Sequence, residues 1–234
     1  MSTAPKTSLI SIIIPTRNAA SRLGETLASV ADVPEVEVLL VDGGSSDETI
    51  AIACAYGVRV LVSEPGRGHQ MNAGAAVAEG DILLFLHGDT VLPEGFAGLV
   101  RATMARPEVA GGAFRLAFEL PKSALRLIAW GANFRSRWLQ MPYGDQALFV
   151  RKELFTAMGG FPELPILEDV VLVRNLKRHG RIVTRPEAVV TSSQRWLQGG
   201  VWRQTLRNQR ILLGFFLGVS FERLAGWYGL GEKG

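Results

Sequence analysis

Residues 38–47, VLLVDGGSSD, form an apolar run that ends in an acidic turn with two glycines. Apolar runs also end in acidic residues in 81–89, DILLFLHGD, and in 166–169, ILED. Short apolar runs of this kind are typical of buried strands, and the carboxyl ends of parallel strands lie at one edge of a sheet. We therefore expect the acidic segments to meet at the carboxyl edge of a parallel sheet, where open α/β sheets bind their ligands. Carboxylates at such an edge suit a divalent metal, a ribose hydroxyl or the abstraction of a proton.

The first hundred residues alternate between strand-like and helix-like segments. We expect strands over residues 9–14, 36–41, 58–62 and 82–86, and helices over residues 21–30 (capped by Ser21), from Ser46 onward and over 70–78. Pro15 is expected to end the first strand, and Gly66-Arg67-Gly68 to be a flexible loop. Repeated βα units of this size predict an α/β fold whose parallel sheet is covered by helices on both faces.

The alternation becomes irregular after Asp89. Helices are expected over residues 93–104, 121–139, 151–158 and 167–178, and strands over 110–120 and 147–150 and around Ile182 and Val189. Residues 201–228 are expected to be helical with a break near Gly218. We predict one domain over residues 1–234, in which 8–120 form a ligand-binding part, 121–190 a second part and 191–234 a helical C-terminal region.

Composition limits the class of protein. The 234 residues are 47% hydrophobic and 20% charged, which is typical of a packed globular domain and not of a disordered chain. The single cysteine, Cys54, excludes an internal disulfide and is expected to be a small core residue. The longest apolar run, residues 211–219, is far shorter than the roughly 20 residues that span a bilayer. Since no basic and apolar leader follows Met1, we expect a cytoplasmic protein.

Charge is unevenly distributed along the chain. Residues 1–100 contain twelve Asp and Glu against five Lys and Arg. Residues 174–210 contain nine Lys and Arg, and Glu187 is their only acid. This basic segment is either a solvated helix face or a surface that meets phosphates, on a substrate or on anionic lipid. We do not expect nucleic acid as a partner, because no basic and aromatic reading module is visible.

Four segments together resemble family 2 glycosyltransferases, which have the GT-A fold. They are SIIIPTRN at residues 11–18, VDGGSSD at 41–47, HGD at 87–89 and the acidic pair at 168–169. Their order and spacing are similar over about residues 8–190, and the chain resembles small soluble bacterial members, among them a subgroup predicted to act in arsenosugar biosynthesis. The resemblance implies a Rossmann-like, mostly parallel central sheet flanked by helices, with a helical C-terminal appendage.

The resemblance also implies a nucleotide-sugar site. Its expected residues are Pro15, Thr16, Asn18, Asp42, Gly43, Arg67, Asp89 and Arg195. Asp42 would accept hydrogen bonds from a nucleobase or a ribose, or else it caps the helix that follows. Family members commonly have a second aspartate where Gly43 stands, which leaves the choice of nucleotide open. Arg67 would meet a phosphate or the nucleobase, or else it lies in an ordinary surface turn.

His87-Gly88-Asp89 occupies the place of the family's metal-binding DxD motif. The implied cofactor is a divalent metal, Mn²⁺ or Mg²⁺, that bridges the donor diphosphate, and Asp89 is the expected ligand. His87 binds the metal, holds a phosphate or only shapes the turn.

The resemblance implies that Asp169 is the general base of an inverting transfer, with Glu168 beside it and Asp145 as a second acid on the acceptor side. Acids at a helix N-terminus also offset the helix dipole, and the two roles are compatible. Arg195 would touch the diphosphate. Trp196 would stack on a sugar or, with Trp202, anchor the C-terminal helices in the core.

The sequence therefore predicts metal-dependent, inverting transfer of a sugar from a nucleotide-diphosphate sugar to a hydroxyl acceptor. The alternatives are a nucleotidyltransferase on a similar scaffold and a sugar-nucleotide-binding protein without turnover. The sequence does not identify the hydroxyl acceptor, for which a lipid-linked compound is one candidate. The C-terminal helices are expected to associate with a membrane surface or to form a homodimer.

Overall fold

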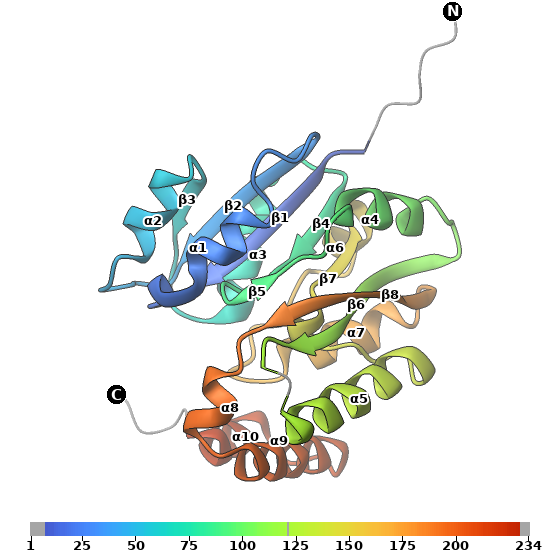
Figure 1. Cartoon of the computed structure of the whole chain (residues 1–234). Coiled ribbons are helices and arrows are strands. Elements are labelled where there is room, and N and C mark those ends of the chain that lie inside the picture. The colour runs from blue at the N-terminus through green and yellow to red at the C-terminus, as the bar shows by residue number, and fades with distance from the viewer. Residues whose placement is uncertain (1–7, 121, 230–234) are drawn as a thin grey trace, which may run out of the picture.

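The computed structural model describes residues 8–120 and 122–229, except for the side chain of Arg195. These residues form one mixed sheet flanked by helices (Figure 1). The strands are β1 (Ile10–Thr16), β2 (Val36–Asp42), β3 (Arg59–Val62), β4 (Ile82–Phe85), β5 (Thr90–Val91), β6 (Val109–Phe118), β7 (Leu148–Arg151) and β8 (Arg181–Thr191). Their spatial order is β3-β2-β1-β4-β7-β6-β8-β5.

The parallel half of the sheet matches the expected βα repeats. β1 is central, and it pairs in parallel with β2 on one side and with β4 on the other, while β3 extends the sheet beyond β2. The second half is mixed, because β7 runs antiparallel to both β4 and β6, and β5 runs antiparallel to β8. The predicted α/β architecture is therefore confirmed, with parallel pairing among β1 to β4 and again between β6 and β8.

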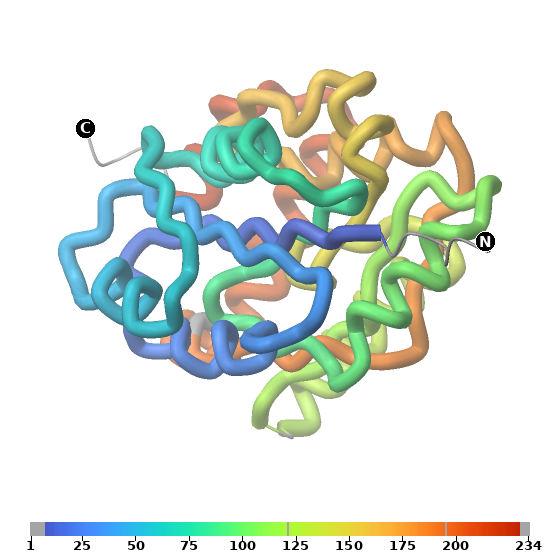
Figure 2. Tube along the Cα trace, turned by 90° about the horizontal axis from the view of Figure 1, so that it is seen from above, coloured from blue at the N-terminus to red at the C-terminus, as the bar shows by residue number. Residues whose placement is uncertain are grey.

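Helices cover both faces of the sheet. They are α1 (Ala20–Ala28), α2 (Thr49–Ala55), α3 (Arg67–Val77), α4 (Phe96–Met104), α5 (Ser123–Trp138), the short 3₁₀ turn η1 (Gly144–Gln146), α6 (Lys152–Ala157), α7 (Glu168–Leu176), α8 (Gln194–Gln198), α9 (Val201–Phe216) and α10 (Phe221–Tyr228). α1, α2 and α4 contribute to one core cluster, and α3, α6 and α7 contribute to the other. The view along the sheet in Figure 2 shows these two layers on either side of the strands.

Several expected boundaries are wrong, for local reasons. β1 continues through Pro15 to Thr16. The missing N–H is tolerated there because β4 ends level with Ile13, so Pro15 lies beyond the last residue of that neighbour. Ser21 does not cap α1, which begins at Ala20. Instead Asp47 Oδ2 accepts a hydrogen bond from the Ala20 N–H at 3.1 Å, so the cap comes from a distant loop.

Other corrections concern segments near the motifs. Arg67 and Gly68 open α3 and are not a loop, and α2 begins at Thr49 rather than at Ser46. One long strand, β8, replaces the two short strands expected around Ile182 and Val189. Residues 166–167 are loop, so the acidic pair after them does not follow a strand.

Two side chains expected in the core are exposed. Cys54 is exposed on α2 and is not a core residue. Trp202 is 58% exposed, so it does not anchor α9 in the core. The expected helical tail with its break is confirmed, since α9 ends at Phe216 and α10 begins at Phe221.

Gly74 sets the distance between α3 and the sheet. A Cβ added there would lie 2.5 Å from Ile13 Cγ2 and 3.0 Å from Val41 Cγ2. We expect Gly74→Ala to lower the free energy of unfolding by about 1–3 kcal/mol, because the core must move to admit the methyl group. The measurement is chemical denaturation.

Gly131→Ala is the matched control, because a Cβ at this position in α5 meets nothing within 4 Å. It is expected to stabilise the protein by about 0.5–1 kcal/mol, the ordinary gain in helix propensity. Equal stabilisation by both substitutions would contradict the close approach of α3.

Candidate functional site

The carboxyl ends of the central strands form one edge, as the sequence predicts. Thr16 at the end of β1 lies level with Asp42 at the end of β2, and the Gly43 N–H donates to Thr16 O at 2.9 Å. His87 follows β4, whose continuation is held by a hydrogen bond of 3.0 Å from Leu86 N–H to Ile13 O. The first two acidic segments therefore converge on one rim of the sheet.

Asp42 organises the turn that follows β2. Its side chain is 1% exposed, and its Oδ2 accepts from the N–H groups of Gly44 at 2.9 Å and Ser45 at 2.8 Å. Its Oδ1 accepts from the Ser45 hydroxyl. In this conformation the carboxylate is engaged internally, and it does not cap α2, which begins seven residues later. Its contact with a nucleobase or ribose stays a prediction.

Asn18 joins the loop after β1 to the same turn. Its N–H donates to Ser45 Oγ at 2.8 Å, and its Oδ1 accepts from the Ser46 N–H at 2.9 Å. Asn18 has a φ of +53°, a conformation that asparagine tolerates better than most residues. The end of β1, with Pro15 and Thr16, and the turn that begins at Gly43 are thus held as one surface.

Gln70 is a residue of this rim that the sequence did not single out. Its side-chain amide, 4% exposed, donates to Thr16 O at 2.8 Å and to Val41 O at 2.7 Å, bridging the ends of β1 and β2. A Cβ at Gly43 would lie 3.0 Å from Gln70 Cδ. Gln70 therefore packs into the space that a side chain at position 43 would occupy. A glutamine in a helix of small residues gives no signal for this role.

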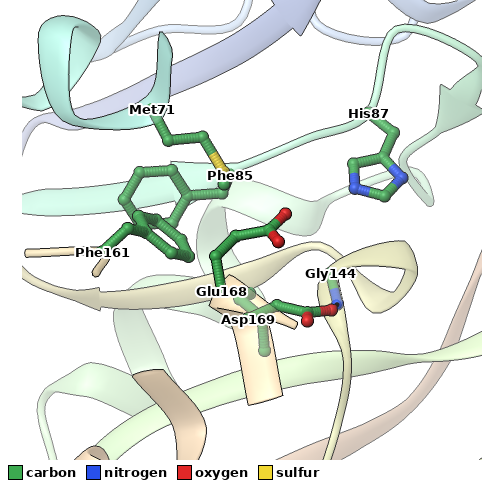
Figure 3. Close-up of a pocket in the computed structure, with 8 residues that line it drawn as sticks. Met71, Phe85, His87, Gly144, Phe161, Glu168 and Asp169 are labelled. Atoms are coloured by element: carbon green, nitrogen blue, oxygen red, sulfur yellow. Dashed lines mark hydrogen bonds between the residues drawn. The ribbon is translucent and has the colours of Figure 1, made fainter. Parts of the chain in front are cut away.

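Asp169 and His87 approach each other across Gly144. The Gly144 N–H donates to Asp169 Oδ2 at 2.6 Å. A Cβ on Gly144 would lie 3.1 Å from His87 Nε2 and 3.2 Å from Asp169 Oδ2. Any side chain at Gly144 would therefore push the imidazole and the carboxylate apart. In Figure 3 His87, Glu168 and Asp169 are gathered around the space beside Gly144.

This space is a small cavity of about 10 Å³. Its lining residues are Met71, Phe85, His87, Gly144, Leu148, Phe161, Glu168 and Asp169. That volume is close to the minimum needed for one water molecule. The rings of Phe85 and Phe161 meet edge to face, with centroids 4.8 Å apart, so one wall of the cavity is apolar.

The loop before α7 is held by the side-chain amide of Asn72, which makes two hydrogen bonds with the backbone of Phe161. Asn72 Nδ2 donates to Phe161 O at 2.9 Å, and Asn72 Oδ1 accepts from the Phe161 N–H at 2.9 Å. Leu167, with a φ of +66°, then turns the chain into α7. Because this left-handed conformation is costly for leucine, its presence beside the acidic pair is typical of a functional site.

Two acids near Asp169 have raised pKa values. Burial, and then the negative charge of Asp169, raise the pKa of Glu168 to about 7, while Arg67 opposes the shift. Burial raises the pKa of Asp145 to about 6, against the nearby Arg135, and its Oδ1 is buried without a hydrogen-bond partner. Near neutral pH the site therefore holds carboxyl groups in different protonation states, which is typical of acid–base chemistry.

Two arginines face this acidic cluster. Arg67 is exposed at the start of α3, and its charge favours the ionised forms of Asp145 and Glu168. Arg135 of α5 lies 3.4 Å from the centroid of the Tyr143 ring, and its Nε donates to Met141 O at 2.9 Å. Arg135 was not anticipated, since only tertiary packing brings it to Tyr143.

The residues near His87 fit a metal that arrives with a substrate. Among residues 8–120 and 122–229, no group of three or more His, Cys, Asp and Glu is placed to hold an ion. Asp89 is half-buried, and its Oδ1 accepts from the Thr90 hydroxyl at 3.3 Å, which leaves lone pairs for other partners. Mg²⁺ and Mn²⁺ are commonly held by one or two carboxylates together with substrate phosphates. The donor set suits that arrangement and does not form a complete cage.

Two predicted contributors lie farther along the chain. Arg195 is in α8, and its side chain is outside the part that the structure describes. Trp196 is partly buried and packs edge to face on Phe118 of β6, with centroids 5.7 Å apart. It thus has the anchoring role that was one of its two predicted roles.

Comparison with known proteins supplies the family. The model of the glycosyl transferase family 2 domain matches residues 11–161, which include the β1, β2 and β4 rim and η1. The chain belongs to glycosyl transferase family 2. Glu168 and Asp169 lie beyond the matched segment, so their roles do not follow from it.

Curated relatives are similar over part of their length. A PGL/p-HBAD biosynthesis glycosyltransferase of Mycobacterium bovis is 41% identical over 95 residues, which cover 37% of this chain and 37% of the relative. A glucosyl-3-phosphoglycerate synthase of Mycolicibacterium paratuberculosis is 28% identical over 96 residues, covering 36% of this chain and 29% of the relative. The chain thus matches well under two thirds of each relative.

Two solved structures are similar to this chain in fold. S. aureus TarS 1–349 in complex with UDP-GlcNAc has a TM-score of 0.61 at 22% identity, over 79% of this chain and 58% of that one. The mannosyltransferase PcManGT from Pyrobaculum calidifontis, in complex with GDP-Man and Mn²⁺, has a TM-score of 0.62 at 21% identity, over 78% and 56% of the two chains. The likeness confirms the expected GT-A fold of family 2.

Glu168→Gln tests the protonation of the buried acid. An unfolded chain has a pKa near 4.5 at this position, whereas the folded protein has a pKa of about 7. Between these values the folded state binds more protons, so the stability of the parent falls as pH rises. We expect the variant to be more stable than the parent by about 1–3 kcal/mol at pH 8, and to lose this advantage towards pH 4.5. The measurement is denaturant unfolding across pH.

Glu163→Gln is the control, because this glutamate lies in the same loop with its side chain 74% exposed. Its unfolding curve is expected to follow that of the parent at every pH. A Glu168→Gln profile parallel to the parent would show that Glu168 is ionised in the folded protein.

Proposed function

We propose that this family 2 protein transfers a sugar from a nucleotide-diphosphate sugar to a hydroxyl acceptor, with inversion at the anomeric carbon. The observation that carries the proposal is the meeting of Asp169 with His87 across Gly144, at the rim that also holds Asp42. A donor site and a candidate base are thereby adjacent. The domain division at residues 120 and 190 remains part of this proposal.

Asp169 acts as the general base in this mechanism. The acceptor hydroxyl gives its proton to the carboxylate while its oxygen forms a bond to the anomeric carbon, and the bond from that carbon to the diphosphate oxygen breaks. The nucleoside diphosphate leaves with the electron pair. The Gly144 N–H occupies one lone pair of Oδ2 and fixes the orientation of the carboxylate.

Glu168 and Asp145 support the base in different ways. Glu168, with a pKa of about 7, is largely neutral at slightly acidic pH, so it adds little negative charge beside Asp169. Asp145 has a buried oxygen that lacks a partner, which suits an acceptor hydroxyl as a hydrogen-bond donor. Asp145 is therefore proposed to orient the acceptor.

The donor is bound along the rim from Pro15 to Asp89. Asn18 and Asp42 hold together the end of β1, with Thr16, and the turn that begins at Gly43. Arg67 is the cation that faces the diphosphate. A divalent cation bound with the donor would be held by Asp89, beside His87, and would offset the charge on the leaving diphosphate. Arg195 is proposed as a second contact to the diphosphate.

Similar proteins support the class of donor. The similar TarS and PcManGT structures contain UDP-GlcNAc and GDP-Man, and the second also contains Mn²⁺. A panel of UDP, GDP, dTDP and CMP sugars, with and without Mn²⁺, would identify the donor by thermal shift, because a bound ligand stabilises the folded state by mass action. Slow hydrolysis of that donor with Mn²⁺ would distinguish an enzyme from a binding protein without turnover.

Asp89→Ala tests the metal assignment. We expect the Mn²⁺-dependent part of the donor-induced thermal shift to vanish while the shift without Mn²⁺ and the unliganded melting temperature are retained, because the variant lacks the carboxylate and not the fold. Glu94→Ala, an exposed acid five residues later, is the control and is expected to behave as the parent. Unchanged Mn²⁺ dependence in Asp89→Ala would remove Asp89 from the metal site.

Asp169→Asn tests the base. The amide keeps the shape of the side chain but cannot take the proton, so turnover is expected to fall about 10²-fold or more with little change in donor affinity. Asp81→Asn, an exposed acid before β4, is the control. Near-normal turnover in Asp169→Asn would transfer the role of base to Glu168 or Asp145.

A further inference from the structure

Two neighbouring helices present large apolar side chains to solvent. On α5 the side chains that are half or more exposed are Leu127, Trp130, Phe134 and Trp138, followed by Leu139. On α9 they are Trp202, Leu206, Leu213 and Phe216, followed by Leu217. We call these ten residues the α5/α9 face. Figure 1 shows α5 and α9 together at the end of the molecule away from β3.

The exposed residues follow the helical repeat, so each helix has an outward apolar stripe. In α5 the spacing from Leu127 to Trp138 is three, four and four residues, while Leu125 and Ala129 pack inward. A surface helix of a globular protein normally has a polar outer face. Contiguous exposed apolar side chains of this size mark an interaction site.

The charges on these helices are of one sign. α5 contains Arg126, Arg135 and Arg137, α9 contains Arg203, Arg207 and Arg210, and neither helix contains Asp or Glu. Since basic residues, tryptophans and leucines without acids are typical of helices that lie at an anionic membrane surface, the charge complements lipid headgroups. A protein partner gives no such reason for excluding every acid.

A groove of about 430 Å³ joins the ends of the two helices. Its lining residues are Leu139, Met141, Arg174, Lys177, Arg178 and Phe216. Three cations come from the C-terminal end of α7, and the apolar residues belong to or adjoin the α5/α9 face. A phosphate with attached acyl chains matches this combination. The cations of the groove would contact the phosphate, and its apolar residues would contact the acyl chains.

We propose that the α5/α9 face and its basic groove dock this protein on the surface of an anionic bilayer. The helices lie on the surface and do not cross it, since α5 and α9 have 16 residues each and none of the helices that the structure describes is long and apolar enough to span a membrane. The proposal goes beyond sugar transfer and does not depend on it.

The docked orientation has a consequence for the site. α7 begins at the acidic pair and ends at the groove, so Asp169 and Lys177 are about 12 Å apart along the helix axis. The loop from Leu139 to Gly144 makes the same connection, through Met141 in the groove wall. The headgroup of a lipid held at the groove would therefore lie on the order of 12 Å from Asp169.

Vesicle flotation of the full chain tests the proposal. The probes are vesicles of phosphatidylcholine alone and of phosphatidylcholine mixed with phosphatidylglycerol. We expect binding to the mixed vesicles to be at least tenfold stronger and to weaken with added salt, because exposed charges are screened. Equal recovery with both lipids would overturn the proposal.

Two double variants separate the charged and apolar contributions. Lys177→Glu with Arg178→Glu reverses two exposed cations of the groove, and Trp130→Ser with Phe134→Ser removes two exposed rings of α5. Each is expected to lower binding to the mixed vesicles at least tenfold while the variant stays folded, as a cooperative melting transition would show. Matched controls on the far edge are Arg59→Glu and Tyr56→Ser with Val62→Ser, which are expected to bind as the parent.

A second copy of the chain is the competing occupant of the face. Light scattering of the same variants decides this point. A dimer of the parent that the Trp130 and Phe134 variant dissociates, together with vesicle binding equal in all variants, would overturn membrane docking in favour of a homodimer. Vesicle binding lost in both groove and face variants, with an unchanged oligomeric state, supports it.

Discussion

The burial of β1 between β2 and β4 is the constraint on which the rest of the structure depends. Ile10, Ile12, Ile13 and Ile14 are fully buried, and their alternation divides them between the two core clusters. Both helix layers therefore pack on the same strand. Because β1 pairs in parallel with both neighbours, the loops after all three strands open at one rim. The position of the candidate site follows from this pairing.

The pKa values of the acids at the site reflect two opposing effects. Burial raises them, and the positive charges of two arginines lower them. Asp145 and Glu168 come from η1 and α7, and burial raises the pKa of both carboxyl groups. Arg67 and Arg135 oppose that effect for Asp145. The result is a set of carboxyl groups that titrate at different pH values within one cluster. This range of pKa values depends on the tertiary fold, since the two arginines come from different helices, α3 and α5.

The sequence predicted those features that depend on local pattern. The strands from β1 to β4 and the convergence of the segments around Asp42 and His87 follow from apolar runs that end in polar turns. It did not predict Gln70 or the cap of α1, because each depends on contacts between segments far apart in the chain, nor Arg135, whose contact with Tyr143 depends on how the loop after α5 folds back. The boundary at Pro15 was wrong for the same reason, since a proline is tolerated where the neighbouring strand has already ended. The exposed stripe of α5 was likewise invisible, because an apolar helix face is expected to be buried.

The packing of Gln70 against Gly43 limits how the proposed donor site can change by descent. An aspartate at position 43 requires the glutamine amide to move, yet that amide is pinned by carbonyl groups of two strands. A mutation at position 43 alone therefore meets a steric penalty, whereas a prior mutation of Gln70 to a smaller residue opens the space. The two positions are epistatic, and the order of the mutations decides which intermediates are viable. A lineage that has glutamine at position 70 is therefore expected to keep glycine at position 43 until position 70 has mutated.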